Sequence, residues 1–229
     1  MANRIFFLSR PSGDLVYEEI SIEFKYYPGF ALSQKQRSVK DMHDSILKLN
    51  PSMKVLEIST KSDNPLGARL SAFNLKYIDN VTGREHPIEN VFQSSKVFMN
   101  GGPFRDLLNR HPGEAKRDLR LKESGPLIEF NLDGVVWDVE PKSMFYDWIY
   151  MSSLYRNESL SKKILEYNAF TDIEFNQEKS INCQARSAAI FVSLCKLGKL
   201  EKVLNNKEEL KRIYSKGGND NTQMSLFDL

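Results

Sequence analysis

Alternating apolar and polar positions predict a small β-sheet in this chain. Residues 4–8 and 15–27 are rich in β-prone side chains, and in the second segment apolar residues recur at every other position, as in a half-buried strand. Residues 54–59 form a third strand-like segment. Turn formers at 80–83 and an Asp-Gly pair within 127–139 indicate two hairpins.

Helical spacing of apolar residues covers much of the remaining chain. Ser33 can cap a helix over 34–49, where apolar residues recur every three or four positions. The segment 60–69 is rich in turn formers, and 171–180 is polar and irregular. The other predicted helices span 104–109, 114–121, 143–155, 158–167, 182–197 and 206–215. We therefore predict one α+β domain over 1–216, mainly helical with a small sheet, and a flexible tail over 217–229.

One predicted helix, over 88–98, carries an unusual set of polar residues. Pro87 suits its first turn, and Gly101-Gly102-Pro103 would end it. At about 100° per residue, Glu89, Gln93 and Lys96 fall within roughly 60° of one another. The helix either buries an acid, an amide and an amine together, as a nucleophilic lysine with a proton carrier requires, or it is a solvated surface helix. Composition alone leaves both open.

Bulk properties exclude several classes of protein. The chain has 229 residues and a net charge of +2, so it is no polycation, and nucleic-acid binding would need a local patch such as Lys116, Arg117, Arg120 and Lys122. The two cysteines, Cys183 and Cys195, and the scattered histidines offer no metal-ligand spacing, so we expect no metal and no cofactor. No disulfide framework, export signal or long apolar run is present, which predicts a cytoplasmic protein without membrane contact.

Two further segments carry polar groups suited to a ligand. The turn around Ser71, Phe73 and Asn74 offers a hydroxyl, an amide and a stacking face, although Phe73 would fit a core equally well. Lys116 and Arg117 are adjacent cations suited to a pyrophosphate, although such a run is usually a solvated helix.

A third segment, 172–176, alternates polar and apolar residues. If it is extended, Asp172, Glu174 and Asn176 project to one side, where they could bind ribose hydroxyls or a base edge. The alternative is a loop that caps the following helix.

Taken in chain order, these segments resemble the NADAR family, also called YbiA-like. That family has a Leu-Ser-Asn-Phe turn, a Glu-x-x-[Phe/Tyr]-Gln-x-x-Lys-x-Phe motif, an Ala-Lys-Arg segment, and a late acidic strand followed by a helix. Here the second motif is complete from Glu89 to Phe98, and the third is 115–117. The first departs from the pattern, because Ala72 stands where the general family has Asn, and Asn74 after Phe73 is the candidate replacement.

One branch of the family is the closer match. Tyr27-Pro28-Gly29-Phe30, 59–62, 70–75 and 180–187 resemble the NADAR antitoxins that are paired with DNA ADP-ribosyltransferase toxins. The resemblance covers roughly residues 3–215, nearly the whole chain. It implies an antitoxin that acts on ADP-ribosylated DNA and has such a toxin as its functional partner.

The resemblance also implies a reaction, the hydrolytic removal of ADP-ribose from guanine bases. Lys96 would capture the ribose carbon as a Schiff base, and Glu89 would carry the proton. A neighbouring Glu favours the charged, unreactive ammonium, so desolvation or the nearby cations must oppose it, and we predict that Lys96 is buried. Lys61 is the main competitor as nucleophile, and Lys116 is another.

By the same resemblance, a larger set of residues would bind the substrate. We expect Ser71, Phe73, Asn74 and Gln93 on the ribose and base side, Lys116 and Arg117 at the diphosphate, and Glu174 and Asn176 closing the pocket, with Lys61 nearby. Two other functions stay open. One is an N-glycosidase acting on a small riboflavin-pathway intermediate, and the other is a non-catalytic protein that binds ADP-ribose or the toxin.

The tail carries a separate signal. After a Gly-Gly pair, Gln223, Leu226 and Phe227 lie in a short stretch that resembles the peptide by which bacterial replication and repair proteins hold the sliding clamp. An apolar tail that packs on its own domain is the alternative. The first interpretation predicts a sliding-clamp partner.

Overall fold

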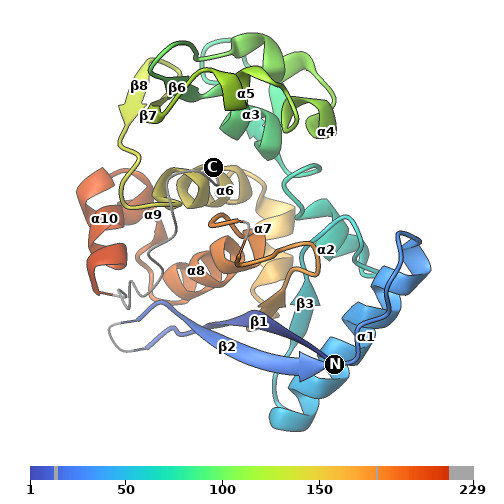
Figure 1. Cartoon of the computed structure of the whole chain (residues 1–229). Coiled ribbons are helices and arrows are strands. Elements are labelled where there is room, and N and C mark those ends of the chain that lie inside the picture. Colours follow the sequence, from blue (N-terminus) through green and yellow to red (C-terminus); the bar gives the residue numbers. More distant parts are fainter. Residues whose placement is uncertain (13–14, 179, 217–229) are drawn as a thin grey trace.

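A computed structural model describes residues 1–12, 15–178 and 180–216 (Figure 1). Its largest sheet has the strand order β2-β1-β9-β3. Strand β1 is antiparallel to β2 and β9, and β3 pairs with β9 in parallel. The four strands are β1 (Ala2–Ser9), β2 (Tyr17–Phe24), β3 (Val55–Glu57) and β9 (Ala169–Thr171).

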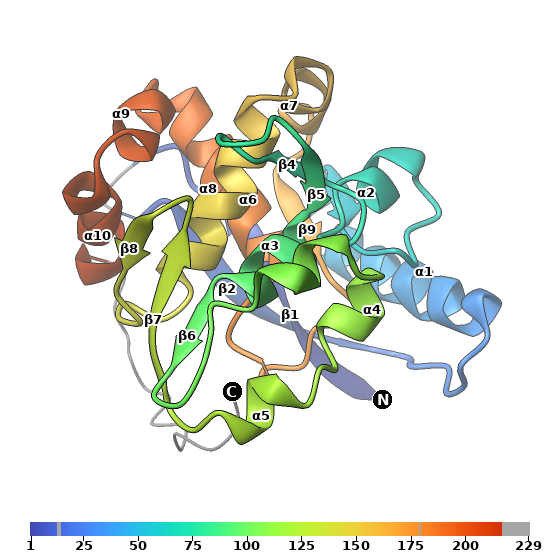
Figure 2. The ribbon, with the colours of Figure 1, turned by 90° about the horizontal axis from the view of Figure 1, so that it is seen from above.

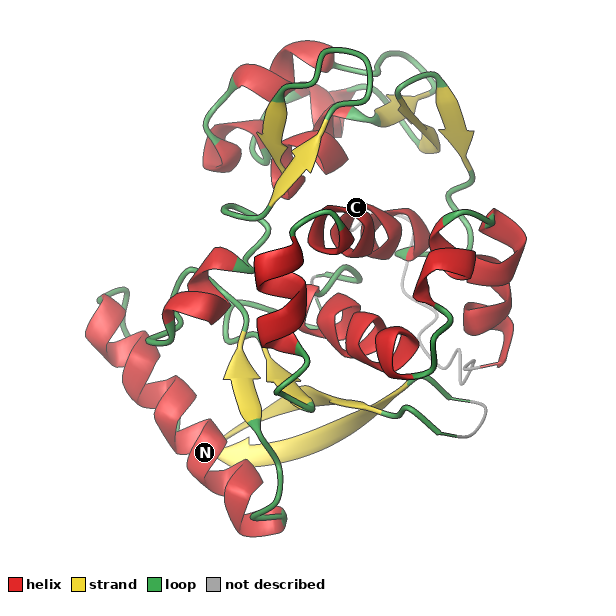
Figure 3. Ribbon diagram, turned by 180° about the vertical axis from the view of Figure 1, so that it is seen from behind, coloured by secondary structure: helices red, strands yellow, loops and turns green. Residues whose placement is uncertain are grey.

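Helices cover both faces of this sheet. Alternate residues of β1 point to opposite faces, so that Phe6 joins one apolar cluster with helix α1 (Leu32–Leu49), while Phe7 joins the main core with α8 (Gln184–Lys196). Helix α6 (Met144–Tyr155) packs on α8 and is buried along most of its length. Figure 3 shows α1 and α8 on different sides of the strands.

A second group of elements lies beyond α6, at the top of Figure 1. It contains α3 (Ile88–Ser94), which packs on α6, and the three-stranded sheet β6-β7-β8. Figure 2 views this layer from above. Its other elements are β6 (Lys96–Phe98), β7 (Leu127–Leu132), β8 (Val135–Trp137), the 3-10 helix η1 (Arg105–Asn109), α4 (Pro112–Ala115) and α5 (Arg120–Glu123).

Several predictions are confirmed. The fold is α+β, the hairpins form at both predicted turns, and the long helices lie within two or three residues of their predicted bounds. The remaining elements are α2 (Pro65–Arg69), the hairpin strands β4 (Lys76–Ile78) and β5 (Glu85–Pro87), α7 (Glu158–Ile164), α9 (Leu200–Leu204) and α10 (Lys207–Lys216). No helix in the described part of the chain combines the length and apolar character needed to cross a bilayer.

Three local assignments made from the sequence differ from the structure. The turn-rich segment 60–69 contains α2, because the Asn64 side chain accepts a hydrogen bond from the Leu66 amide and Pro65 is the first helical residue. Ser33 is not a cap, since α1 already begins at Leu32. Strand β9 went unrecognised between the predicted helix 158–167 and the segment 171–180 predicted as irregular, because its three residues are all buried and show no alternation.

The predicted helix over 88–98 is also wrong in its second half. Helix α3 ends at Ser94, where the Ser94 and Ser95 hydroxyls both donate to the Val91 carbonyl and close the last turn. Lys96 then opens strand β6, which pairs with β7 opposite Phe130. Glu89 and Gln93 therefore share a helix, whereas Lys96 reaches the same region from a strand.

Candidate functional site

Helix α3 buries its polar residues. All seven of its residues are buried, which excludes the solvated surface helix. One of them has a structural role, because the Asn90 side-chain amide donates to the carbonyls of Leu107 and Arg110 and so fastens η1 to α3. Glu89 and Gln93, the acid and the amide of the predicted site, are buried on the same helix.

The acid and the amide form a direct pair. Gln93 Nε2 donates to Glu89 Oε1 at 2.9 Å, and Glu89 is only 5% exposed. Lys116 Nζ lies 3.9 Å from the same oxygen, on a side chain that is 60% exposed. Glu89 also lies in the first turn of α3, where the helix dipole favours a negative charge. Glu89 is thus a buried acid that contacts a neutral amide, Gln93, and an exposed cation, Lys116.

The amine is buried, as predicted. Lys96 is 9% exposed, and its Nζ lies 4.9 Å from the centre of the Phe92 ring. Burial lowers the pKa of Lys96 to about 8, with Glu89 acting in the opposite direction and Lys116 lowering it further. Desolvation outweighs the acid, which is the balance that a nucleophilic lysine requires.

Aromatic rings form much of the wall around this amine. Lys96 lines a cavity together with Phe92, Phe130, Phe145 and Tyr146. The Tyr146 ring packs edge-on against Phe92 at 5.3 Å. These rings shield the Lys96 amine from water, and this desolvation is the main physical cause of its lowered pKa.

Two buried oxygens at the site have no protein partner. Gln93 donates through Nε2, but its Oε1 accepts no hydrogen bond from the described residues. The same is true of Oδ1 of Asn182, which lines the cavity of Lys96 from the loop before α8. Because buried acceptors are normally satisfied, each of these two atoms is available to accept a hydrogen bond from water or from a ligand. Sequence reasoning missed Asn182 and Tyr146 as site residues.

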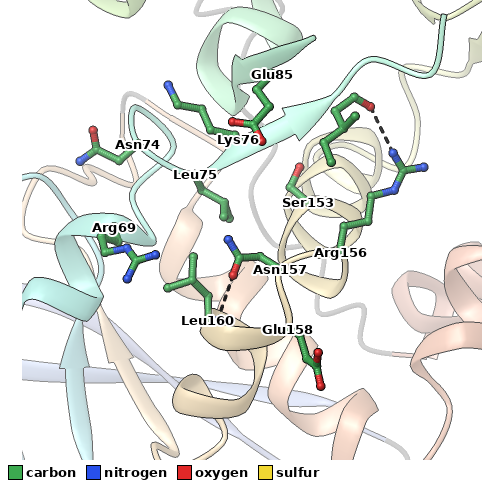
Figure 4. A pocket seen from close by; sticks show the side chains of 11 residues that line it. Arg69, Asn74, Leu75, Lys76, Glu85, Ser153, Arg156, Asn157, Glu158 and Leu160 are labelled. Carbon is green, nitrogen blue, oxygen red and sulfur yellow. Dashed lines mark hydrogen bonds between the residues drawn. The ribbon is translucent and has the colours of Figure 1, made fainter. Parts of the chain in front are cut away.

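The Ser71–Asn74 turn supports Glu89 through its backbone. The Glu89 amide donates to the Ala72 carbonyl at 3.0 Å. Ser71 is buried and its hydroxyl donates to the Ala68 carbonyl, so that hydroxyl is used within the turn. Asn74 lines a different cavity, with Arg69 and Lys76 (Figure 4), and the structure does not bring it to Lys96.

Three other predicted residues do not line the cavity that contains Lys96. Arg117 is exposed and its Nε donates to the Gly113 carbonyl, one residue beyond Lys116. Lys61 is half-buried and does not line the cavity that contains Lys96. Phe73 is half-buried in the turn that supports Glu89.

The segment 172–176 is not extended, so the prediction that Asp172, Glu174 and Asn176 project to one side is wrong. The Phe175 amide donates to the Asp172 carbonyl and closes a turn. Asp172 is consequently buried, while Glu174 is exposed and forms an ion pair with Lys35. Asn176 accepts a hydrogen bond from a backbone amide two residues later.

A hydrogen-bond chain links this turn to the backbone amide of Glu89. Gln184 Nε2 donates to Asp172 Oδ2 at 2.9 Å, and Gln184 Oε1 accepts from the Ala72 amide at 2.6 Å. The Ala72 carbonyl then accepts from Glu89, as described above. Burial, followed by the charge of Glu57, raises the pKa of Asp172 to about 7. Sequence reasoning did not assign Gln184 a role, because its partners are remote in the chain.

Two predicted features concern metal binding and the tail. Among the residues that the structure describes, no cluster of three or more His, Cys, Asp and Glu is placed to hold a metal ion. Gln223, Leu226 and Phe227 lie outside the described residues, so sliding-clamp binding stays a prediction.

Comparison with known proteins identifies the family. A model described as DarT1-associated NADAR antitoxin matches residues 2–224. The chain belongs to this antitoxin family. A comparison with curated proteins gave no significant match. The family match confirms the resemblance on which the sequence interpretation depended, and it spans Glu89, Gln93 and Lys96 of the antitoxin.

Proposed function

We propose that this antitoxin is a glycohydrolase that removes ADP-ribose from guanine bases of DNA. The observation that carries the proposal is the buried amine of Lys96, whose pKa is lowered to about 8, in the same site as the buried acid Glu89. At pH 7 about a tenth of such an amine is neutral, compared with roughly one part in three thousand for an unperturbed lysine. A neutral, buried amine beside an acid is the arrangement that nucleophilic catalysis requires, whereas binding alone does not require it.

The reaction follows from these two groups. The neutral Lys96 amine attacks ribose C1, and the bond from C1 to the guanine nitrogen breaks with its electron pair moving to that nitrogen. Glu89, which has accepted the proton of the Lys96 ammonium, donates it to the departing guanine, and the amine now attached to C1 passes one of its protons to the ring oxygen. Opening of the sugar ring gives a Schiff base. Water then adds to its carbon, a proton returns to Glu89, and the Lys96 amine leaves, so that the net change is hydrolysis to ADP-ribose and guanine.

The remaining site residues suit the substrate. The unpartnered oxygens of Gln93 and Asn182 can accept from ribose hydroxyls or guanine N–H groups. Lys116 and its neighbour Arg117 are exposed cations beside the acid, which suits the diphosphate. Phe73 offers an aromatic face on the turn that supports Glu89.

Four other predicted residues would contact parts of the substrate beyond the ribose. Ser71 shapes the turn, Asn74 lies on its outer side, and Glu174 and Asn176 lie in the loop after β9. We keep these residues as proposed contacts to the parts of ADP-ribosylated DNA beyond the ribose. The toxin partner follows from the family, whose members are associated with DarT1. By removing the modification, the enzyme would reverse the damage that such a toxin causes.

The test uses an oligonucleotide with a single ADP-ribosylated guanine. The full chain should release ADP-ribose and restore the guanine, as followed by mass spectrometry of both products. Lys96→Arg keeps the charge but not the reactive amine, and should abolish release, while Lys76→Arg on the surface serves as the matched control. Absence of release by the unaltered protein would move the assignment to an antitoxin that acts by binding its toxin.

A further inference from the structure

A second surface of the antitoxin combines aromatic and basic side chains. It consists of the loop 25–31, between β2 and α1, and the first turns of α1. Phe30 at the tip of this loop is fully exposed, with 104% relative exposure, and Leu32 is 52% exposed. An aromatic ring this open makes no contribution to the core, and its face is free to contact a partner.

Cations lie near the rings of two tyrosines in the same loop, Tyr26 and Tyr27. The Arg37 guanidinium lies 4.2 Å from the centre of the Tyr27 ring, and Lys25 Nζ lies 5.2 Å from the same centre. Lys35 Nζ lies 5.7 Å from the centre of the Tyr26 ring. Residues 25–40 contain four Lys or Arg and no Asp or Glu, although the whole chain carries only +2. This segment is therefore locally cationic, and of its four cations Lys35 is paired with an acid, Glu174.

The loop is held in place before any partner arrives. The Tyr27 amide donates to the hydroxyl of buried Ser38 at 2.9 Å, and the Lys25 amide donates to Asp41 at 2.7 Å. Gly29 has a φ of +130°, which side chains rarely tolerate, and this turn presents Phe30 to solvent. A preformed surface loses less conformational entropy on binding than a loop that must first be ordered.

The surface is connected to the proposed active site. Lys35 pairs with Glu174 at 3.1 Å, and the Glu174 amide donates to Asp172, from which the hydrogen-bond chain runs to Glu89. Figures 1 and 2 both show α1 on the same side of the molecule as α4, next to which Lys116 lies. A strand whose modified guanine enters the site can thus extend over this surface.

We propose that loop 25–31 and the start of α1 bind single-stranded DNA next to the modified guanine, with Phe30 stacking on an unpaired base and Arg37 and Lys25 contacting phosphates. The inference rests on the proposed function, because it extends the same substrate beyond its ADP-ribose. Exposed rings and a cationic track are the two parts that single-strand binding sites share, and stacking requires bases that are not paired.

The experiment measures the Kd of the full chain for a fluorescent, unmodified single-stranded oligonucleotide by anisotropy. We expect Phe30→Ala to weaken binding about tenfold, and Arg37→Gln to weaken it and to reduce the slope of log affinity against log salt by roughly 0.7. Val81→Ala and Arg84→Gln, in the exposed β4–β5 turn, are matched controls that should leave the Kd unchanged. No binding by the unaltered protein, or equal loss in the controls, would overturn the proposal.

Activity measurements with two substrates test the DNA-binding surface and the proposed glycohydrolase function separately. Phe30→Ala should lower kcat/KM on an ADP-ribosylated oligonucleotide while leaving turnover of ADP-ribosylated guanosine unchanged. If both substrates suffer equally, Phe30 supports the fold or the active site and the DNA surface is refuted. If neither substrate is hydrolysed by the unaltered protein while Phe30→Ala still weakens binding, the DNA surface stands and the glycohydrolase assignment fails.

Discussion

Replacing Lys96 with methionine is expected to abolish turnover and also to stabilise the fold. The side chain is 9% exposed, and burial disfavours its charged form enough to lower its pKa from 10.5 to about 8. Methionine has a similar length and no charge, and its sulfur can take the place of the amine near the Phe92 ring. The variant therefore keeps the packing and removes the cost of a buried ammonium.

The pKa values set the size and the pH dependence of this gain. A difference of about 2.5 pH units between the folded and unfolded lysine corresponds to roughly 3 kcal/mol. Between pH 8 and 10.5 the unfolded chain binds more protons than the folded one, so the stability of the unaltered protein rises with pH across this window. The advantage of Lys96→Met is thus complete below pH 8 and is lost as the pH approaches 10.5.

Chemical denaturation at pH 7 and at pH 10 measures this difference directly. We expect the midpoint of Lys96→Met to exceed that of the unaltered protein clearly at pH 7 and much less at pH 10. Lys76→Met, at an exposed position on β4, is the control and should change little at either pH. A Lys96→Met protein that is less stable at pH 7, or whose advantage does not depend on pH, would show that burial of the Lys96 ammonium does not destabilise the fold.

Three further variants test the neighbouring groups. Glu89→Gln should slow single-turnover release by about 10²–10⁴-fold even though it lowers the pKa of Lys96 further, and a faster reaction would exclude Glu89 as proton carrier. Gln184→Leu removes the acceptor of the Ala72 amide and should slow release about tenfold while the adduct still forms on Lys96; an unchanged rate would show that the chain to Glu89 does not position it. The folded pKa of Asp172, near 7, exceeds its ordinary 3.8, so stability falls as the pH rises between these values. Asp172→Asn should reduce that fall, as measured by chemical denaturation at pH 5 and pH 8. An equal loss of stability between these pH values in the variant and in the unaltered protein would contradict the prediction.

The sequence predicted the contents of the site better than its geometry. Glu89 and Gln93 do lie on one helix, and Lys96 is buried as the chemistry required. The helical stripe that grouped them was nevertheless wrong for Lys96, because strand β6 has only three residues and gives no alternation to detect. The motif order, rather than the helical period, made the grouping correct.

The contacts that support the candidate site could not be predicted from the sequence, because they depend on tertiary packing. Gln184 and Ala72 are 112 residues apart, and their contact exists only because α8 packs beside the turn after α2. Tyr146 lies on α6, whose residues are buried on nearly all sides and so show no face that marks the cavity. Asp172 depends on β9, a strand too short to be recognised from its pattern.

The most direct measurement of the central claim is chemical trapping of the intermediate. The full chain is incubated with an oligonucleotide bearing ADP-ribosylated guanine, borohydride is added, and the modified peptide is found by mass spectrometry. We predict release of ADP-ribose together with a stable adduct on Lys96, and no adduct in Lys96→Arg. An adduct on Lys61 or Lys116, or undiminished release by Lys96→Arg, would contradict the account.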